Sequence, residues 1–341
     1  MQSDIPYSLA FLKKLNALTV KGIPIHEYFR DGEFFLWPIQ QYFLLSQIKE
    51  YSRHKDYTSY VNAHSVRTPF FSVCKRVLVN AFILIVSLLA VCKMRIMKTP
   101  TLVFSSDILK PGTRYNPRLF ETFMLLEKQK VPYADFIHTV GGTKLLSNFL
   151  RLRRIVFYSE SINILIALLG YARRNPLWEE AISTLDLSTF TDSEKSFVRA
   201  LLQETLRNMD VSRHKIRLLK RALSYTTIQS FIAIDDVRQI HEILGACRDL
   251  GIQSFVYQHS NFDYLSGLDE LPPQHYIFPD VFFVWNAYWQ ERIPALSPLF
   301  SYYKTRLVIG GRGYTFTPGA CVERSLSYDT ALRVMVPYEI N

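Results

Sequence analysis

The stretch Phe231–Tyr257, FIAIDDVRQIHEILGACRDLGIQSFVY, decides the fold. It opens with the apolar run Phe231–Ile234, which is typical of a strand buried on both faces of a sheet. Asp236 begins a capping-box pattern, which predicts a helix that Gly251 ends. A second apolar run, Ile252–Tyr257, follows at once. A strand, a helix and a strand in this order predict a βαβ unit whose strands pair in parallel.

The same alternation of strands and helices extends to both sides of this unit. Further strands are predicted at Thr101–Phe104, Tyr133–Ile137, Arg154–Tyr158, Val281–Trp285 and Arg306–Ile309. Asn116 followed by Pro117 predicts a helix start, and Pro294 is expected to end the helix after Val281–Trp285. The fold class expected from this pattern is α/β, with a doubly wound, mostly parallel Rossmann-like sheet and an added helical N-terminal region.

The pattern also predicts how the chain divides. Residues 1–98 form a helical, basic and apolar region, and residues 99–330 form the α/β domain, with a helical insertion at 161–224. Ala331–Val336 has the composition of one more strand, which would open a second Rossmann-like domain at 331–341. Because the sequence ends at Asn341, we expect that second domain to be truncated.

Composition and charge limit the classes of function that the chain can have. The 341 residues are 48% hydrophobic, which is typical of a folded chain, and the four cysteines stand too far apart for a zinc ribbon or a disulfide framework. Residues 1–230 hold 32 Lys and Arg against 18 Asp and Glu, whereas residues 231–341 hold 8 against 12. A basic N-terminal part favours anionic partners, although a solvated surface explains it equally well. We expect no nucleic-acid partner.

One apolar run, Val77–Cys92, leaves three interpretations open. Basic residues flank it on both sides: Lys75, Arg76, Lys93, Arg95 and Lys98. It is shorter than the ~20 apolar residues of a spanning helix, and its flanks show no charge asymmetry. A buried core helix, a helix lying in the inner leaflet and a true membrane span all remain possible. We expect a cytoplasmic protein, peripheral to an anionic inner-membrane surface.

Candidate site residues follow the predicted strands, because ligands of open α/β sheets bind beyond the carboxyl ends of the strands. His259 and Asp235 are the candidate catalytic residues, since an imidazole accepts a proton near neutral pH and a carboxylate holds hydroxyl groups. The candidate substrate-binding residues are Asp236, Arg238, Gln258, Ser260, Glu160, Gly310 and Gly311. Each has a structural alternative: Asp236 as a helix cap, His259 as a partner of loop backbone, and Arg238 as a surface residue.

Several motifs are absent from the sequence. It contains no GxxxxGK[ST], GxGxxG, GxSxG or HExxH pattern, which argues against a P-loop, a dinucleotide fingerprint, a hydrolase elbow and a zinc protease. No Asp-x-Asp pair occurs either, and the His and Cys residues lack metal-ligand spacing. We therefore expect no metal site.

Four segments carry a resemblance to a known family: FIAIDD at 231–236, FVYQHS at 255–260, FPDVFFVWNAYWQERI at 278–293 and RLVIGG at 306–311. They resemble the N-terminal, acceptor-side domain of bacterial GT-B-type glycosyltransferases that build surface polysaccharides. In that family a strand ends in Gln-His-Gly, and a later strand reads Pro-Asp-x-Phe-x-Val-Trp-Gly. Ser260 and Asn286 stand here in place of the two glycines.

The resemblance implies two Rossmann-like domains that face a cleft. It implies sugar transfer without a metal or other cofactor, from a nucleotide sugar held mainly by the second domain to a glycan or lipid-linked acceptor. His259 matches the histidine of the family's Gln-His pair, which implies a role as general base or acceptor-binding residue. The chain alone is expected to be inactive.

Two other functions stay open. One is a non-catalytic, membrane-peripheral module that binds an anionic glycolipid or a partner protein. The other is a relative of the UDP-sugar 2-epimerases, which belong to the same superfamily.

Overall fold

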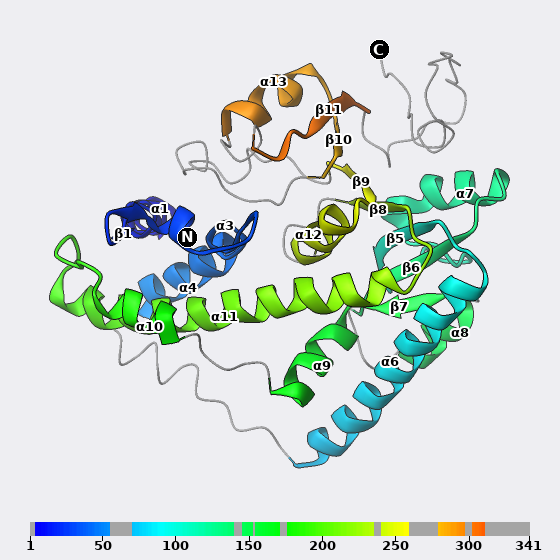
Figure 1. Ribbon diagram of the computed structural model, residues 1–341, viewed down its shortest axis with the longest axis horizontal. Helices are drawn as coiled ribbons and strands as arrows, with labels where there is room; N and C mark the ends of the chain where they lie inside the picture. Colours follow the sequence, from blue (N-terminus) through cyan, green and yellow to red (C-terminus); the bar gives the residue numbers. More distant parts are fainter. Residues whose placement is uncertain are drawn as a thin grey trace.

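A parallel sheet forms the centre of the molecule (Figure 1). The computed structural model describes residues 4–54, 70–139, 145–152, 154–170, 176–234, 240–258, 279–296 and 302–310. The strands of the sheet are β5 (Thr101–Ser106), β6 (Tyr133–His138), β7 (Val156–Tyr158), β8 (Ser230–Ile234), β9 (Gln253–Tyr257), β10 (Val281–Val284) and β11 (Arg306–Ile309). They confirm the predicted strands to within two residues at each end.

The strand order shows where the chain reverses direction across the sheet. The seven strands lie in the order β11-β10-β9-β8-β5-β6-β7, and every neighbouring pair is parallel. The chain runs outward from β5 to β7 and then returns to β8, on the other side of β5. This is the strand order of doubly wound sheets, extended by one strand, and it confirms the predicted α/β class with a Rossmann-like parallel sheet.

Helices cover both faces of the sheet, which explains why its strands are apolar throughout. On one face, Phe123 of α7 (Phe120–Lys128) packs with Phe255 and Phe283. On the other face, α11 (Asp192–Ser224) and α12 (His241–Leu250) pack over the sheet in a cluster that includes Phe136 and Phe231 (Figure 1). The remaining helices around the sheet are η1 (Pro117–Leu119), α8 (Leu145–Leu152), α9 (Glu160–Leu169), α10 (Pro176–Ser183) and α13 (Ala287–Leu296).

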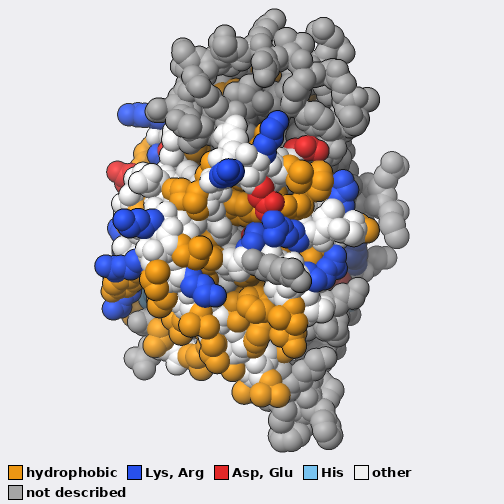
Figure 2. Space-filling view, turned by 90° about the vertical axis from the view of Figure 1, so that its right-hand side faces the viewer, with side chains coloured by type: hydrophobic (Ala, Val, Ile, Leu, Met, Phe, Trp, Pro, Cys, Tyr) orange, Lys and Arg blue, Asp and Glu red, His pale blue; other side chains and the backbone are white. Residues whose placement is uncertain are grey.

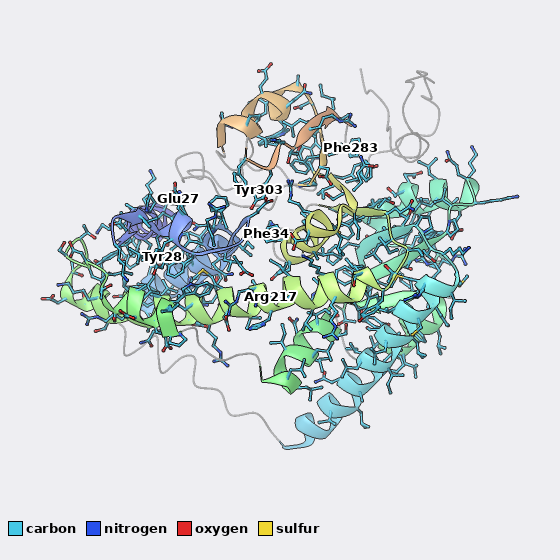
Figure 3. The ribbon with its side chains drawn as sticks, in the orientation of Figure 1. Glu27, Tyr28, Phe34, Arg217, Phe283 and Tyr303 are labelled. Atoms are coloured by element: carbon cyan, nitrogen blue, oxygen red, sulfur yellow. The ribbon has the colours of Figure 1, made fainter. Side chains whose placement is uncertain are left out.

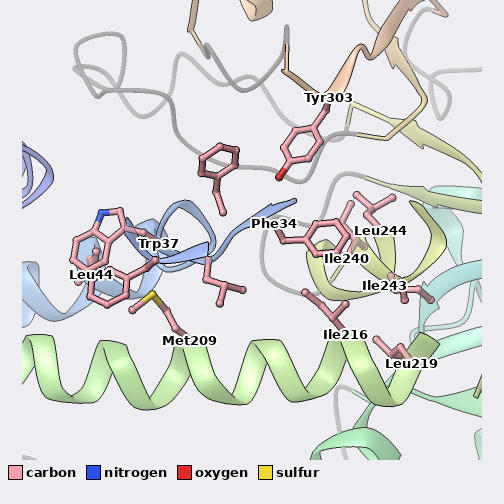
Figure 4. Packing of buried hydrophobic residues seen from close by; sticks show 14 of the residues in the cluster. Phe34, Trp37, Leu44, Met209, Ile216, Leu219, Ile240, Ile243, Leu244 and Tyr303 are labelled. Carbon is pink, nitrogen blue, oxygen red and sulfur yellow. The ribbon is translucent and has the colours of Figure 1, made fainter. Parts of the chain in front are cut away.

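The N-terminal region shares its hydrophobic core with the sheet. It holds α1 (Asp4–Asn16), β1 (Thr19–Val20), β2 (Ile23–Pro24), α2 (Ile25–Tyr28), β3 (Arg30–Asp31), β4 (Phe34–Phe35), α3 (Leu36–Ile39) and α4 (Gln41–His54). Figure 4 shows Trp37 above Met209 of α11, and Phe34 beside Ile240. Figure 3 places Phe34, Arg217 and Tyr303 in the same part of the molecule, and Arg217 pairs with Asp31 at 3.0 Å. The two short hairpins, β1–β2 and β3–β4, were not predicted.

Three sequence predictions of helix limits need comment. Asn116 caps η1 as expected, and its side chain accepts a hydrogen bond from the Arg118 amide. The helix of the βαβ unit begins at His241 with Ile240 in the capping position, so the prediction that Asp236 caps it is wrong. The predicted stop at Pro294 is also wrong, because α13 continues to Leu296, and Pro294 lies in its last turn. The predicted strand Ala331–Val336 lies outside the described residues.

Helix α6 (Phe70–Ile96) contains the apolar run and is longer than it. Residues Val77–Ile96 are long and apolar enough to cross a membrane, and 22% of their most apolar window is buried. The buried positions include Ile83, Ser87, Ala90 and Met94, which fall on one side of the helix. The Tyr158 amide of edge strand β7 donates to Ser87 Oγ at 3.0 Å, so α6 covers this edge of the sheet.

The long helix α11 begins with a capping box. Thr191 Oγ1 accepts from the Glu194 amide at 3.4 Å, and the Glu194 carboxylate accepts from the Thr191 amide at 2.9 Å. Thr191→Ala is expected to lower the free energy of unfolding by about 1 kcal/mol. The control is Ser224→Ala at the far end of α11, where an exposed hydroxyl donates to the Arg221 carbonyl at 2.8 Å and bonds no amide of the first turn. Urea unfolding of both variants measures the difference, and equal stabilities would contradict the prediction.

Candidate functional site

The carboxyl edge of the sheet, where the strand order reverses between β5 and β8, is the natural place for a ligand. β5 ends there in Ser106, and Asp107 follows it directly. The Asp107 amide donates to the His138 carbonyl at 3.1 Å, which joins the ends of β5 and β6. On the other side of the reversal, β8 ends at Ile234.

A histidine and a carboxylate pair at this edge. His138 is the last residue of β6, and Glu160 is the first residue of α9, just beyond β7. Parallel pairing of β6 and β7 brings the ends of these strands side by side. His138 Nδ1 lies 2.7 Å from Glu160 Oε1, and the side chains are 35% and 21% exposed. The pair is therefore partly buried and open to solvent on one side.

Glu160 is held in its ionised form. Burial acts to raise the pKa of its carboxyl group, but hydrogen bonds from His138 and from the Thr139 amide at 2.7 Å outweigh burial and keep that pKa below its ordinary value. An ionised Glu160 that accepts the Nδ1 proton of His138 fixes the tautomer in which Nε2 is basic. The geometry is that of a histidine base with an orienting carboxylate.

Further acidic and phenolic groups surround this pair. Asp107 is buried, and its carbonyl accepts from Asn148 Nδ2 at 3.0 Å. Burial raises the pKa of the Tyr158 hydroxyl, and the charges of Asp107 and Glu160 raise it further. Tyr158 therefore stays protonated at neutral pH.

The first turn of η1 is anchored to the end of β5. Asn116 Nδ2 donates to Ser106 Oγ at 2.7 Å, while Asn116 Oδ1 accepts from the Arg118 amide at 2.9 Å. One buried side chain thus joins the strand end to the segment that leads into α7. This contact holds the backbone beside the reversal point.

Gln258 has a structural position at the end of β9. Its side-chain oxygen accepts from the Trp285 amide at 3.0 Å, and its carbonyl accepts from Trp285 Nε1 at 2.8 Å. The side chain is buried and holds the ends of β9 and β10 together. These contacts favour a positioning role over substrate binding.

Gly310 and Asn286 also have structural roles. A Cβ atom on Gly310 would lie 3.1 Å from Cβ of Phe283, so a larger residue would crowd the neighbouring strand. Asn286 Oδ1 accepts from the Trp289 amide at 3.3 Å and caps α13. The asparagine therefore explains the start of this helix.

The predicted site residues do not all meet. Adjacent strands lie ~4.8 Å apart, so Glu160 after β7 is roughly 19 Å from Gln258 after β9 and roughly 29 Å from Gly310 after β11. Glu160 belongs with His138 and Asp107, whereas Gln258 and Gly310 belong to the opposite half of the edge. Asp235, Asp236, Arg238, His259, Ser260 and Gly311 lie outside the described residues.

Sequence reasoning did not select His138 as a site residue. His138 follows the predicted strand Tyr133–Ile137 just as His259 follows its own strand, and this position was the available signal. Its pairing with Glu160, 22 positions further along the sequence, depends on the neighbouring positions of β6 and β7. Among the described residues, no group of three or more His, Cys, Asp or Glu could hold a metal ion.

A second polar cluster lies near the opposite, amino edge of the sheet. Arg154 Nε pairs with Asp135 Oδ2 of β6 at 2.9 Å, with the two side chains 8% and 0% exposed. The Arg154 guanidinium stacks over Phe123 at 4.6 Å and Tyr133 at 5.1 Å, and Glu127 accepts hydrogen bonds from Tyr115 and Tyr133. Because aromatic rings enclose the charge, this cluster is a structural one.

Comparison with known proteins assigns no function, so a function must be inferred from the residues of this chain. No family model, no curated protein and no solved structure matches this chain.

Proposed function

We propose that this chain is the acceptor-side domain of a GT-B-type glycosyltransferase. Such an enzyme transfers a sugar from a nucleotide-sugar donor to a lipid-linked or surface-polysaccharide acceptor. The observation that carries the proposal is the His138–Glu160 pair at the carboxyl edge of a parallel sheet whose strand order reverses at β5 and β8. The described strands of the segments that resemble this family, β8, β9, β10 and β11, lie in the same sheet.

The pair suits the acceptor half of the reaction. His138 takes the proton of an acceptor hydroxyl as that oxygen bonds to the anomeric carbon of the donor sugar. The bond from the anomeric carbon to the phosphate oxygen breaks, and the nucleoside diphosphate leaves with the electron pair. Glu160 stabilises the imidazolium that forms, because the carboxylate stays ionised beside it. Donor binding belongs to a second domain in this proposal.

The test is transfer of label from nucleotide sugars to lipid-linked glycans, made with the protein translated from its complete reading frame. Transfer that requires the acceptor supports the proposal. Interconversion of UDP-sugars without an acceptor would instead identify an epimerase. Absence of both reactions, together with binding of the glycolipid, would identify a binding module.

The binding module is the second candidate because of one specific observation. Helix α6 presents exposed leucine and isoleucine side chains on the side away from the sheet. A protein that only docks on a glycolipid-bearing membrane would need this surface and no base. The His138–Glu160 pair favours the enzyme.

A further inference from the structure

An apolar surface remains exposed on the outer side of α6. Leu78, Ile85, Leu88, Leu89 and Ile96 are between 54% and 79% exposed. At 100° per residue these positions fall on one stripe of the helix, opposite the buried stripe of Ile83, Ser87, Ala90 and Met94. Both stripes are mainly apolar, but among the described residues the inner one is buried and the outer one is exposed.

Helix α8 extends this surface. Phe149 of α8 packs edge-on against Phe82 of α6, with ring centres 5.5 Å apart. Leu146 and Leu150, one turn apart on α8, are exposed. Together with the outer stripe of α6, they form what we call the apolar face. Figure 2 shows apolar side chains gathered on the side of the molecule that carries α6 and α8, bordered by Lys and Arg side chains.

Basic residues flank the stripe on both sides. Lys93 and Arg95 are exposed, and on the helix surface one lies to each side of the line through Ile85 and Leu89. Lys98 follows the helix end and is also exposed. Long cationic side chains beside an apolar stripe reach lipid phosphates while the stripe enters the hydrocarbon. Soluble monomers rarely leave such a continuous apolar surface uncovered.

The inner stripe argues against a membrane span. Ser87 bonds the end of β7, and Ala90 and Met94 belong to the same core as the sheet. A helix that crossed the bilayer while holding these contacts would draw the edge of the sheet into hydrocarbon. Backbone groups of an open sheet have no hydrogen-bond partners there.

We propose that α6 lies in the plane of an anionic membrane surface, with the apolar face inserted and Lys93, Arg95 and Lys98 bound to lipid phosphates. This docking is independent of the sugar-transfer reaction. The contact between Ser87 and Tyr158 places the His138–Glu160 pair at the sheet edge that α6 covers. This position suits a lipid-linked substrate of the proposed function.

Flotation of the protein with lipid vesicles tests the docking. We expect binding to vesicles of phosphatidylcholine with about one-third phosphatidylglycerol, and several-fold weaker binding to pure phosphatidylcholine or at high salt. Leu88→Gln and Leu89→Gln should each weaken binding about 10-fold, since each removes an inserted leucine. Lys93→Gln should weaken binding about five-fold on anionic vesicles only. Ile309→Gln, on the exposed opposite edge of the sheet, is the matched control and should bind normally.

Depth measurement separates docking from spanning. Two proteins are labelled with a fluorophore, one at Cys92 and the other at position 85 of an Ile85→Cys, Cys92→Ser variant. In both proteins Cys74 and Cys321 are replaced by serine, and Cys247 is buried. In-plane docking predicts equal, shallow quenching depths at the two positions. A span would place them about 10 Å apart in depth. The proposal would be overturned by unequal depths or by normal vesicle binding of Leu88→Gln. It would also be overturned if the protein bound no vesicles and instead formed a dimer that Leu88→Gln dissociates.

Discussion

Replacing His138 by alanine is expected to lower the turnover number of the proposed sugar transfer by about 100-fold or more, with a much smaller change in KM for the acceptor. General-base catalysis by a positioned side chain contributes about 10²- to 10⁴-fold to a rate. His138 is the described histidine that an ionised carboxylate orients at the carboxyl edge of the sheet. The alanine variant should keep its fold, because the side chain is 35% exposed.

The chain offers a closely matched control for this variant. His26 in α2 is also 35% exposed and lies 3.7 Å from a carboxylate, that of Glu27, but it belongs to the N-terminal region and not to the sheet. His26→Ala should therefore leave turnover unchanged. Initial rates at saturating acceptor, with circular dichroism of each protein, make the measurement. Equal turnover of His138→Ala and wild type would remove His138 from the mechanism.

Glu160 acts through His138 and is a positioning residue. Glu160→Gln keeps the size of the side chain but removes the negative charge that fixes the imidazole tautomer. Its turnover should fall about 10-fold, and the double variant with His138→Ala should be no slower than His138→Ala alone. An additive loss in the double variant would mean that Glu160 has a separate role.

The strands could be predicted from sequence because this sheet is parallel and covered on both faces. Phe231–Ile234 and Val281–Val284 are uniformly apolar for that reason, and Gly251 ends its helix in the left-handed conformation with φ of 68°. The order of the strands could not be predicted, because it depends on contacts such as β5 with β8 between residues more than 120 positions apart. The separation of Glu160 from Gln258 and Gly310 depends on that same order.

Local patterns failed where tertiary contacts decide. Asp236 and Gln239 match a capping box, but the described helix begins after Ile240, which is buried in the core. The short hairpin β3–β4 does have a local signal, because Gly32 opens its two-residue loop with a positive φ of 61°. Phe35 of its second strand also packs edge-on against Tyr302. The sequence alone left the environment of α6 undecided, because both sides of this helix are apolar. The burial of Ser87 in the structure distinguishes the inner side from the outer side.

Replacing Arg154 by methionine is expected to lower the free energy of unfolding by about 3–5 kcal/mol at neutral pH. The substitution keeps much of the length of the side chain but leaves Asp135 of β6, which is 0% exposed, without its counter-charge. Among the described residues, neither carboxylate oxygen of Asp135 accepts a hydrogen bond, so the ion pair with Arg154 carries the stabilisation of this charge. Urea unfolding at pH 7 measures the loss.

Asp135→Asn should be far milder than Arg154→Met, because the two partners of the ion pair are not equivalent. Without the Asp135 charge, the Arg154 guanidinium keeps its contacts with Phe123 and Tyr133 and its hydrogen bond to the Arg114 carbonyl at 2.8 Å. Adding Asp135→Asn to Arg154→Met should restore part of the lost stability, since the double variant buries no charge. A double variant as unstable as Arg154→Met would show that packing, and not charge, causes the loss.

The two proteins, wild type and Asp135→Asn, should also differ in their response to pH. Burial raises the pKa of Asp135 from its ordinary value of 3.8 to about 6, against the opposing effect of Arg154 and Arg114. The native state therefore binds this proton more tightly than the unfolded state, so its contribution to stability is present at low pH and is lost as pH rises through 6. Between pH 4.5 and pH 7 the wild type should lose about 2 kcal/mol relative to Asp135→Asn, which cannot titrate at this position. A stability difference that stays constant over this range would mean that Asp135 is ionised throughout, held by Arg154 strongly enough to overcome its burial.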